Sequence, residues 1–220
     1  MKNIAAFIDH TLLTPTAVPS DIEKLCKEAM EYNIHGVCVN GCYTDLAVDL
    51  LKETSINICT VIGFPLGSMS TPSKVMEAEN AVTSGADEID MVINQGWVQN
   101  GYYSKVLQEI HFIKRSIGGA TLKIILETGN MNIEQMVRAT ETAMEAGADF
   151  IKTSTGFGPR GASLEDIRII RKITGDITGI KASGGIKTLE DTVKFIKAGA
   201  SRIGTSNGAA IIKAANALNL

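Results

Sequence analysis

The chain has 220 residues and lacks several features that mark whole classes of protein. Its only cysteines, Cys26, Cys38, Cys42 and Cys59, include no CxxC pair, and with three scattered histidines they form no zinc pattern. No apolar run approaches the roughly 18 residues of a membrane span. An acidic residue within the first ten positions argues against a signal peptide. We therefore predict four reduced thiols in a cytoplasmic protein that binds no membrane.

The chain also lacks an excess of charge of either sign. Lys and Arg number 21 and Asp and Glu number 24, which gives a net charge of −3 and no reason to expect a nucleic-acid partner. Aromatic residues make up only 5%, whereas 45% of residues are hydrophobic and 20% are charged. This balance excludes wholesale disorder. The 21 glycines and the scarcity of aromatics predict tight turns around an aliphatic core.

What the chain does contain is a regular alternation of strand-like and helix-like segments. Short runs rich in β-branched residues predict eight strands. Runs such as Lys123–Leu126 look apolar throughout, which fits a parallel sheet covered on both faces. The predicted strands are Ala5–Asp9, Gly36–Asn40, Ile56–Gly63, Glu88–Asn94, Leu122–Thr128, Phe150–Thr155, Thr178–Ser183 and Arg202–Thr205.

Between these strands, apolar residues spaced three to four apart predict amphipathic helices. Thr71 before Pro72, Asn132 and Ser163 are typical residues for starting a helix. The clearest predicted helices are Ser20–Tyr32, Thr71–Ser84, Tyr102–Ile117, Ile133–Ala146, Leu164–Ile173 and Leu189–Ala198.

A short repeat connects each of three helices to the strand that follows it. In each copy a glycine that can adopt a positive φ ends the helix, at Gly85, Gly147 and Gly199. The chain contains eight predicted strand–helix units, with no linker or change of composition between them. They predict one domain over residues 1–220, closed as a (β/α)8 TIM barrel of the α/β class. A doubly wound open sheet is the alternative. The barrel is favoured because no GxGxxG follows the first strand.

Three ionisable residues lie inside predicted strands: Asp90, Lys152 and Lys181. A charged group in a buried strand is costly unless it is paired or used, so a structural ion pair is one interpretation. Two lysines on consecutive strands near a carboxylate are better explained by a catalytic site. Repulsion between ammonium groups and burial would each lower a lysine pKa, and a neutral amine is what Schiff-base chemistry needs. The carboxylate could then move protons.

The last two strand-to-helix loops predict an anion site. Ser183 precedes Gly184 and Gly185 after one strand, and Gly204 precedes Thr205 and Ser206 at the next. Small residues let backbone N–H groups approach a phosphate, and TIM barrels often bind phosphate in these two loops. The expected substrate is therefore a small phosphorylated carbonyl compound.

The segments that contain the charged strand residues and the two anion loops resemble those of the deoxyribose-phosphate aldolases (the DeoC family). The resemblance covers nearly the whole chain in order. The segments Phe150–Gly158 and Lys181–Ile186 are its most specific parts. The other segments are Ile8–Leu13, Gly63–Gly67, Gly85–Asn94, Glu127–Gly129 and Arg202–Ser206. The resemblance implies a class I aldolase that reversibly cleaves 2-deoxy-D-ribose 5-phosphate to acetaldehyde and glyceraldehyde 3-phosphate, through a lysine imine and without a metal or other cofactor.

The resemblance also implies roles for individual residues. Lys152 would be the Schiff-base lysine, Lys181 the lysine that tunes its amine, and Asp90 the acid/base partner acting with a bound water. Substrate contacts would come from Asp9 and Thr11 near the hydroxyls, Cys38, Thr155 and Gly156 in the pocket, and Gly184, Gly185, Gly204, Thr205 and Ser206 at the phosphate. Partners would be these small molecules and further copies of the chain, as a homodimer or homotetramer.

Some alternatives stay open at this point. Another phosphosugar barrel enzyme, an isomerase or a transaldolase-like transferase, could use the same kind of site, and Glu127 is the residue that could serve as an isomerase base, although supporting the lysines is its favoured role. A sensor that binds sugar phosphates without turnover is a third possibility. Arg160 departs from the family pattern. It could contact the substrate phosphate or be a solvated loop residue.

Overall fold

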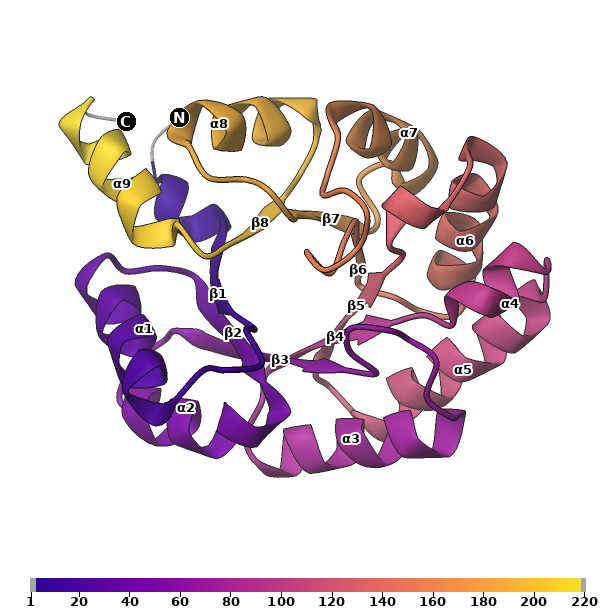
Figure 1. The fold of residues 1–220 in the computed structure, drawn as a ribbon, viewed down its shortest axis with the longest axis horizontal. Helices are drawn as coiled ribbons and strands as arrows, with labels where there is room; N and C mark the ends of the chain where they lie inside the picture. Colours follow the sequence, from indigo (N-terminus) through magenta and orange to yellow (C-terminus); the bar gives the residue numbers. More distant parts are fainter. Residues whose placement is uncertain (1–2, 219–220) are drawn as a thin grey trace.

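The fold is a closed barrel of eight parallel strands in chain order, β1 to β8, each neighbour hydrogen-bonded to the next and β8 to β1. The computed structural model describes residues 3–218. Figure 1 looks down the barrel, with the strands around the centre and the helices as an outer ring. The prediction of a TIM barrel is thus confirmed, and the open-sheet alternative is wrong because β1 pairs with both β2 and β8.

The strands are short and the helices cover their outer faces. The strands are β1 Ile8–Leu12, β2 Gly36–Asn40, β3 Asn57–Ile62, β4 Glu88–Val92, β5 Thr121–Ile125, β6 Phe150–Lys152, β7 Gly179–Ser183 and β8 Arg202–Thr205. The helices are α1 Pro19–Glu31, α2 Thr44–Leu51, α3 Thr71–Thr83, α4 Gln95–Gln99, α5 Tyr103–Ser116, α6 Ile133–Glu145, α7 Leu164–Thr174, α8 Leu189–Ala198 and α9 Gly208–Ala217. Three single 3-10 turns occupy Ile4–Phe7, Gly41–Tyr43 and Thr128–Asn130.

The first predicted strand, Ala5–Asp9, is misplaced. Residues Ile4–Phe7 form a 3-10 turn in which Ile4 and Ala5 are buried, and β1 begins only at Ile8. Alanine has a low preference for strands, so the apolar character of this segment reflects burial rather than pairing in the sheet. The consequence matters for function, because it brings Thr11 into the strand and carries β1 further toward the carboxyl end of the barrel.

The residues predicted to start and end helices do so, except that the cap of α3 lies one residue earlier than predicted. Asn132 and Ser163 cap α6 and α7 by accepting a hydrogen bond from the backbone N–H three residues later. At α3 the cap is Ser70 rather than Thr71, which is the first residue of the helix. The repeat glycines Gly85, Gly147 and Gly199 all adopt positive φ, as their place after a helix requires.

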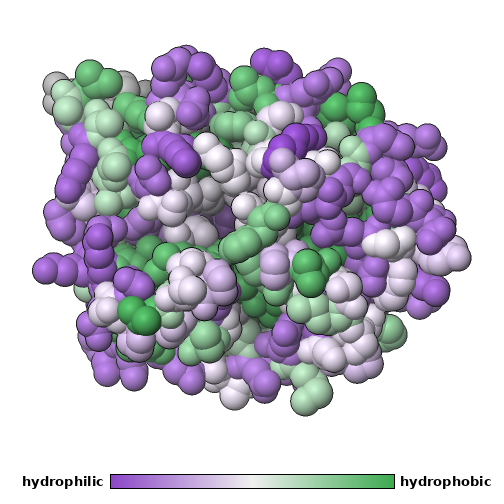
Figure 2. All heavy atoms as spheres, in the orientation of Figure 1, coloured by the Kyte–Doolittle hydropathy of each residue, from purple (hydrophilic) through white to green (hydrophobic). Residues whose placement is uncertain are grey.

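Apolar side chains fill the layer between strands and helices. Two large buried clusters lie there, one around Ile89, Ile124 and Ile151 and the other around Ile8, Ile22 and Val37. Figure 2 shows hydrophilic residues over much of the rim of this face, with weakly polar and apolar residues nearer its middle. Because the outward-facing positions of the strands supply this apolar layer, the alternate, inward-facing positions are free to carry polar groups. Within residues 3–218 no helix combines the length and apolarity that crossing a bilayer demands.

Candidate active site

The strand register brings the charged residues of five strands together inside the barrel. Asp90 of β4 is aligned with Lys123 of β5, and Lys152 of β6 is aligned with Lys181 of β7. Lys181 is in turn aligned with Arg202 of β8. Because side chains alternate between the two faces of a strand, aligned residues point to the same side of the sheet. All five side chains therefore meet in the barrel interior.

Asp90 is the centre of this cluster. It is fully buried, and each of its two oxygens accepts from ammonium groups. Oδ2 lies 2.7 Å from Nζ of Lys152 and 2.8 Å from Nζ of Lys181, and Oδ1 lies 2.7 Å from Nζ of Lys123. Cys59 adds an S–H donor 3.1 Å from Oδ1. The two lysines predicted from the sequence thus share one carboxylate oxygen, and a third lysine holds the other.

A second set of ion pairs lies beside the first. Nζ of Lys181 is 2.5 Å from Oδ2 of Asp9, and Nη1 of Arg202 is 2.9 Å from the other oxygen of Asp9. Glu88 neutralises Lys123 at 2.6 Å and Arg202 at 3.3 Å. The cluster therefore contains three carboxylates, three lysines and one arginine, and a buried ion network of this kind is tolerated only because each charge is paired.

The network keeps Asp90 and Lys181 charged. Burial raises the pKa of Asp90, but the ammonium groups of Lys123, Lys152 and Lys181 outweigh burial and hold this pKa well below its usual range. Burial lowers the pKa of Lys181, but Asp9 and Asp90 outweigh it, so the pKa of Lys181 stands well above its usual value. The sequence argument that both lysines would have lowered pKa values is wrong for Lys181. The neighbouring ammonium group alone would lower this pKa, but the two carboxylates that contact Lys181 outweigh it.

These shifts predict how stability depends on pH. The pKa values of Asp9, Glu88 and Asp90 are lowered in the folded protein, so their contribution is complete above about pH 5 and is lost as the pH falls through the folded values. The pKa values of Lys123 and Lys181 are raised, so their contribution is complete below about pH 9 and is lost as the pH rises. We expect a plateau in the free energy of unfolding between these limits, measured by urea denaturation. Stability that increased on acidification below about pH 4 would contradict the network.

A cavity of about 280 Å³ lies above this cluster. Lys152 reaches its floor, while Asp90 and Lys181 are fully buried beneath it. Its wall combines the two loops predicted to bind an anion with residues of β1 and of the loop after β6. The sequence-predicted residues that line it are Thr11, Lys152, Thr155, Gly156, Gly184, Gly185, Gly204, Thr205 and Ser206. An amine at the bottom and small residues around the mouth are the arrangement a phosphorylated carbonyl compound would require.

Two predicted substrate contacts lie elsewhere. Asp9 is fully buried between Lys181 and Arg202 and does not line the cavity, so its position suits holding Lys181 rather than touching hydroxyl groups. Cys38 is also fully buried, with its sulfur 4.0 Å from Oδ2 of Asp90. Both were assigned to the substrate by resemblance alone, and both belong to the layer beneath the cavity floor.

Glu127 and Arg160 have structural partners that the sequence did not predict. Glu127 has a positive φ of 58° and accepts hydrogen bonds from the backbone N–H and the hydroxyl of Thr155. It does not line the cavity, so it is placed neither as an isomerase base nor against the lysines. Arg160 forms two hydrogen bonds to Asp166, at 2.5 and 3.0 Å, and a third to the carbonyl of Thr128. Both residues fix the loop after β6, on which Thr155 and Gly156 lie.

Two groups of side chains have metal-ligand types at short range. One contains Cys38, Cys59 and Asp90, and the other contains Asp9, His35 and Glu88. The carboxylates in both groups are already neutralised by lysine or arginine at 2.5 to 3.4 Å. A metal ion would therefore have to displace a paired cation at either place.

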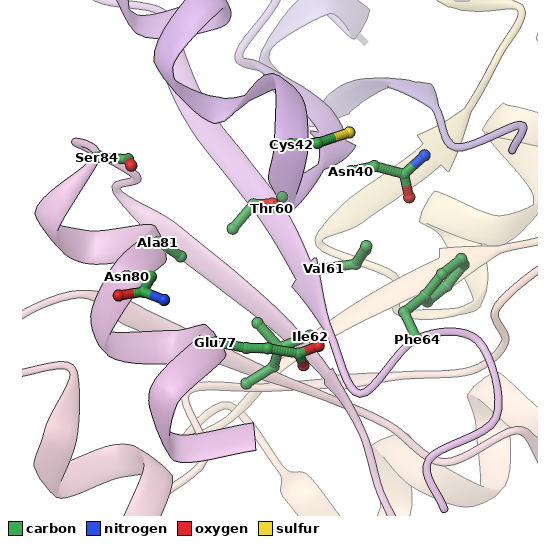
Figure 3. Close-up of a pocket in the computed structure, with 11 residues that line it drawn as sticks. Asn40, Cys42, Thr60, Val61, Ile62, Phe64, Glu77, Asn80, Ala81 and Ser84 are labelled. Carbon is green, nitrogen blue, oxygen red and sulfur yellow. The ribbon is translucent and has the colours of Figure 1, made fainter. Parts of the chain in front are cut away.

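A larger cavity, of about 370 Å³, lies outside the barrel between β3 and α3. Figure 3 shows Glu77, Asn80 and Ala81 of α3 on one side of it and Asn40 and Cys42 on another. Its described lining carries a carboxylate and no lysine or arginine. This electrostatic character suits neither a phosphate nor a Schiff base, so the smaller cavity above Lys152 remains the candidate active site.

Sequence reasoning missed Lys123, Glu88, Arg202, Cys59 and Lys187. Lys123 was included in a run described as apolar throughout, although the test applied to Lys152 and Lys181, a charge inside a strand, selects it equally. Glu88 stands two residues before Asp90, and that spacing puts both carboxylates on one face of β4. Lys187 is exposed, lines the cavity next to Gly185, and follows the predicted anion loop.

Comparison with known proteins agrees with the geometry of the site. The sequence model of one family, described as DeoC/LacD family aldolase, matches residues 3–215. A deoxyribose-phosphate aldolase of Thermoanaerobacter sp. (strain X514) is 49% identical over 221 residues, covering 99% of each chain. A solved aldolase named QR15 has a TM-score of 0.96 and 41% identity, covering all of this chain and 98% of its own. The deoxyribose phosphate aldolase of Aeropyrum pernix, described as having a unique tetrameric structure, has a TM-score of 0.91 and 31% identity, covering 98% of this chain and 92% of its own.

Proposed function

The chain belongs to the DeoC/LacD family of aldolases, and from this premise we propose that Lys152 forms the imine through which it cleaves 2-deoxy-D-ribose 5-phosphate to acetaldehyde and glyceraldehyde 3-phosphate. One observation carries the assignment. Among the lysines of the buried cluster, Lys152 is the one that lines the cavity, whereas Lys123 and Lys181 lie beneath it. A nucleophile must touch the substrate, so the lysine at the cavity floor is the candidate.

In the proposed reaction, the neutral amine of Lys152 adds to the aldehyde carbon of the open-chain sugar phosphate. Loss of water gives a protonated imine. This imine accepts the electron pair released when the bond between C3 and C4 breaks, so glyceraldehyde 3-phosphate leaves and an enamine of acetaldehyde remains on Lys152. Protonation of the enamine and hydrolysis of the new imine release acetaldehyde. The imine supplies the electron sink, and therefore no step in this proposal calls for a metal ion.

Asp90 is the proposed group for moving protons in these steps. Its Oδ2 atom is 2.7 Å from Nζ of Lys152, within the range for proton transfer. Three ammonium groups lower the pKa of Asp90 after burial has raised it, which makes the resting carboxylate a weak base. When Lys152 becomes neutral one of these three charges disappears, so the carboxylate becomes more basic at the stage where a proton must be taken up. Lys181 stays charged and holds the carboxylate in place.

The direct test of the proposal is to supply 2-deoxy-D-ribose 5-phosphate and identify the products. We expect acetaldehyde and glyceraldehyde 3-phosphate in equal amounts. An isomerase would instead convert the substrate to another sugar phosphate of the same mass, and a sensor would bind it and leave it unchanged. Either result would overturn the assignment.

The loops around the cavity mouth carry the proposed phosphate site. Gly184 and Gly185 have φ values of 87° and 80°, a conformation that leaves their backbone N–H groups accessible to an anion. Thr205 and Ser206 lead into the N-terminus of α9, where the helix dipole favours negative charge. Lys187 adds the positively charged side chain that a dianion would pair with.

Replacing Lys187 with alanine tests the phosphate site. We expect KM for 2-deoxy-D-ribose 5-phosphate to rise about tenfold, the effect of losing roughly 1.4 kcal/mol of ion pairing, with little change in kcat. KM for unphosphorylated 2-deoxyribose should not change. Lys172→Ala, which removes an exposed lysine from α7, is the matched control. Equal effects on both substrates would show that Lys187 does not contact the phosphate.

Two predictions remain beside this proposal. Assembly as a homodimer or homotetramer stays a prediction, supported by the description of the Aeropyrum pernix relative as tetrameric. The cytoplasmic location also stays a prediction.

A further inference from the structure

Two cysteines face each other inside the barrel, one strand apart. Cys38 of β2 and Cys59 of β3 are aligned partners in the parallel sheet, and their sulfur atoms lie within 4.8 Å of each other and of Asp90. Aligned residues of neighbouring strands have Cα atoms about 4.8 Å apart, which is inside the range of about 4.4 to 6.8 Å found for disulfides. The aldolase reaction proposed above uses neither sulfur as a nucleophile. The pair is therefore a cluster of reactive groups with no role in that reaction.

The charges around the two sulfurs make them unequal. Lys123 donates a hydrogen bond to the sulfur of Cys59 at 3.2 Å, and the thiol of Cys59 donates to Asp90. The neighbouring Cys59 thiol is the main cause that lowers the pKa of Cys38, with Lys181 adding to it against the effect of burial. Burial and the neighbouring Cys38 and Asp90 raise the pKa of Cys59 well above its usual value. The thiol of Cys38 is thus the more readily deprotonated of the two.

Leu13 connects this pair to the cavity that reaches Lys152. Cys38 and Cys59 form an apolar cluster with Leu13, Val61 and Phe64. Leu13 itself lines the cavity that reaches Lys152. Phe64 packs edge-to-face on Phe157, another residue of the cavity wall, with ring centroids 5.6 Å apart. Both thiols are buried and do not line this cavity, so hydrogen peroxide, which is smaller than the two-carbon aldehyde that must reach Lys152, would have to pass Leu13 to reach them.

We propose that Cys38 and Cys59 are an oxidation site at which a hydroperoxide converts the two thiols to a disulfide. The thiolate of Cys38 attacks the peroxide oxygen, the O–O bond breaks, and the products are a sulfenic acid on Cys38 and hydroxide. The thiol of Cys59 then displaces the hydroxyl group of the sulfenic acid as water and forms the S–S bond. The two thiols lose two electrons in total, and the peroxide takes up both.

The disulfide acts on the aldolase site through Asp90. Formation of the S–S bond removes the S–H donor that Cys59 provides to Oδ1 of Asp90, and it ties β2 to β3 at the depth of the lysine cluster. The proton-moving carboxylate then loses one of its hydrogen bonds. Aldolase activity should fall in proportion to the fraction of protein that carries the disulfide, and dithiothreitol should restore it.

The chemistry can be tested without measuring activity. In a Cys42→Ser protein, which lacks the exposed thiol, hydrogen peroxide should remove the mass of two hydrogen atoms from the intact chain, beside one oxygen atom gained for each methionine that becomes the sulfoxide. Digestion without reductant should yield a peptide pair joined through Cys38 and Cys59. Cys26 stays in this protein as an internal control, since its thiol is buried in the outer layer and its pKa is raised to about 11 by burial.

Adding Cys59→Ala to the Cys42→Ser protein defines the order of the steps. Without the second thiol, Cys38 should stop at the sulfenic acid, which dimedone traps. A peptide map without the pair joined through Cys38 and Cys59, or with a disulfide that includes Cys26, would overturn the proposal. If the Cys59→Ala protein fails to fold, the peptide map of the Cys42→Ser protein alone decides. Because these readouts are chemical, they stay decisive even if the proposed aldolase activity is wrong.

Discussion

Replacing Lys152 with methionine is expected to lower kcat by about 10⁴-fold or more, because it removes the only lysine of the buried cluster that lines the cavity and so the atom that forms the imine. Methionine has nearly the length of lysine and fills the same space, so the barrel should fold normally. Asp90 would keep two of its three ammonium partners, Lys123 and Lys181. The loss should therefore appear in catalysis and hardly at all in stability.

The measurement is a steady-state assay beside a thermal melt of the same sample. Lys172→Ala, on the outer face of α7, is the control for an unrelated lysine and should leave both unchanged. A Lys152→Met enzyme that kept more than about one hundredth of the activity would mean that another nucleophile operates.

Replacing Asp90 with asparagine is the second change with a large expected effect. Asparagine has nearly the same shape, but the ammonium groups of Lys123, Lys152 and Lys181 lose the carboxylate that they share. Breaking a buried ion network in this way costs about 3–5 kcal/mol of unfolding free energy. Loss of the proton-moving group should also lower kcat by about 10²- to 10⁴-fold.

The pH dependence of the Asp90→Asn protein separates this account from simple loss of packing. Three lysines crowded together without Asp90 are destabilising while they are protonated, so stability should recover as the pH rises toward about 10 and they lose protons. Asp166→Asn is the matched control, since Asp166 pairs with Arg160 outside the cluster and its removal should give no such recovery. If the deficit of the Asp90→Asn protein were the same at all pH values, repulsion among the lysines would not be its cause.

The barrel itself was predictable because the strands and helices have distinct periods. The predicted runs Gly36–Asn40 and Arg202–Thr205 match β2 and β8 residue for residue, and Leu189–Ala198 matches α8. The first strand was misplaced because burial alone makes a segment apolar, whether it pairs in a sheet or, like Ile4–Phe7, forms a 3-10 turn packed in the outer layer.

The candidate site was predictable only in part, for a physical reason. Lys152 and Lys181 are predictable as charged residues inside apolar strands, a criterion that Lys123 also meets. Lys123, at the third position of its strand, was passed over as part of an aliphatic run. Its role depends on register, since alignment with Asp90 places it inside the barrel, and register is not visible in a single strand. The same limit explains the error about the pKa of Lys181, because the carboxylate of Asp9 comes from a strand far away in the chain.

The measurement that tests the central claim most directly is the intact mass of the protein after sodium borohydride reduction in the presence of acetaldehyde. Borohydride reduces an imine to a stable secondary amine, so the wild-type chain should gain one ethyl group in place of one hydrogen, located by peptide mapping at Lys152. The Lys152→Met protein should gain none. A wild-type chain without the label, or a label spread over exposed lysines in both proteins, would contradict the assignment of Lys152 as the imine-forming residue.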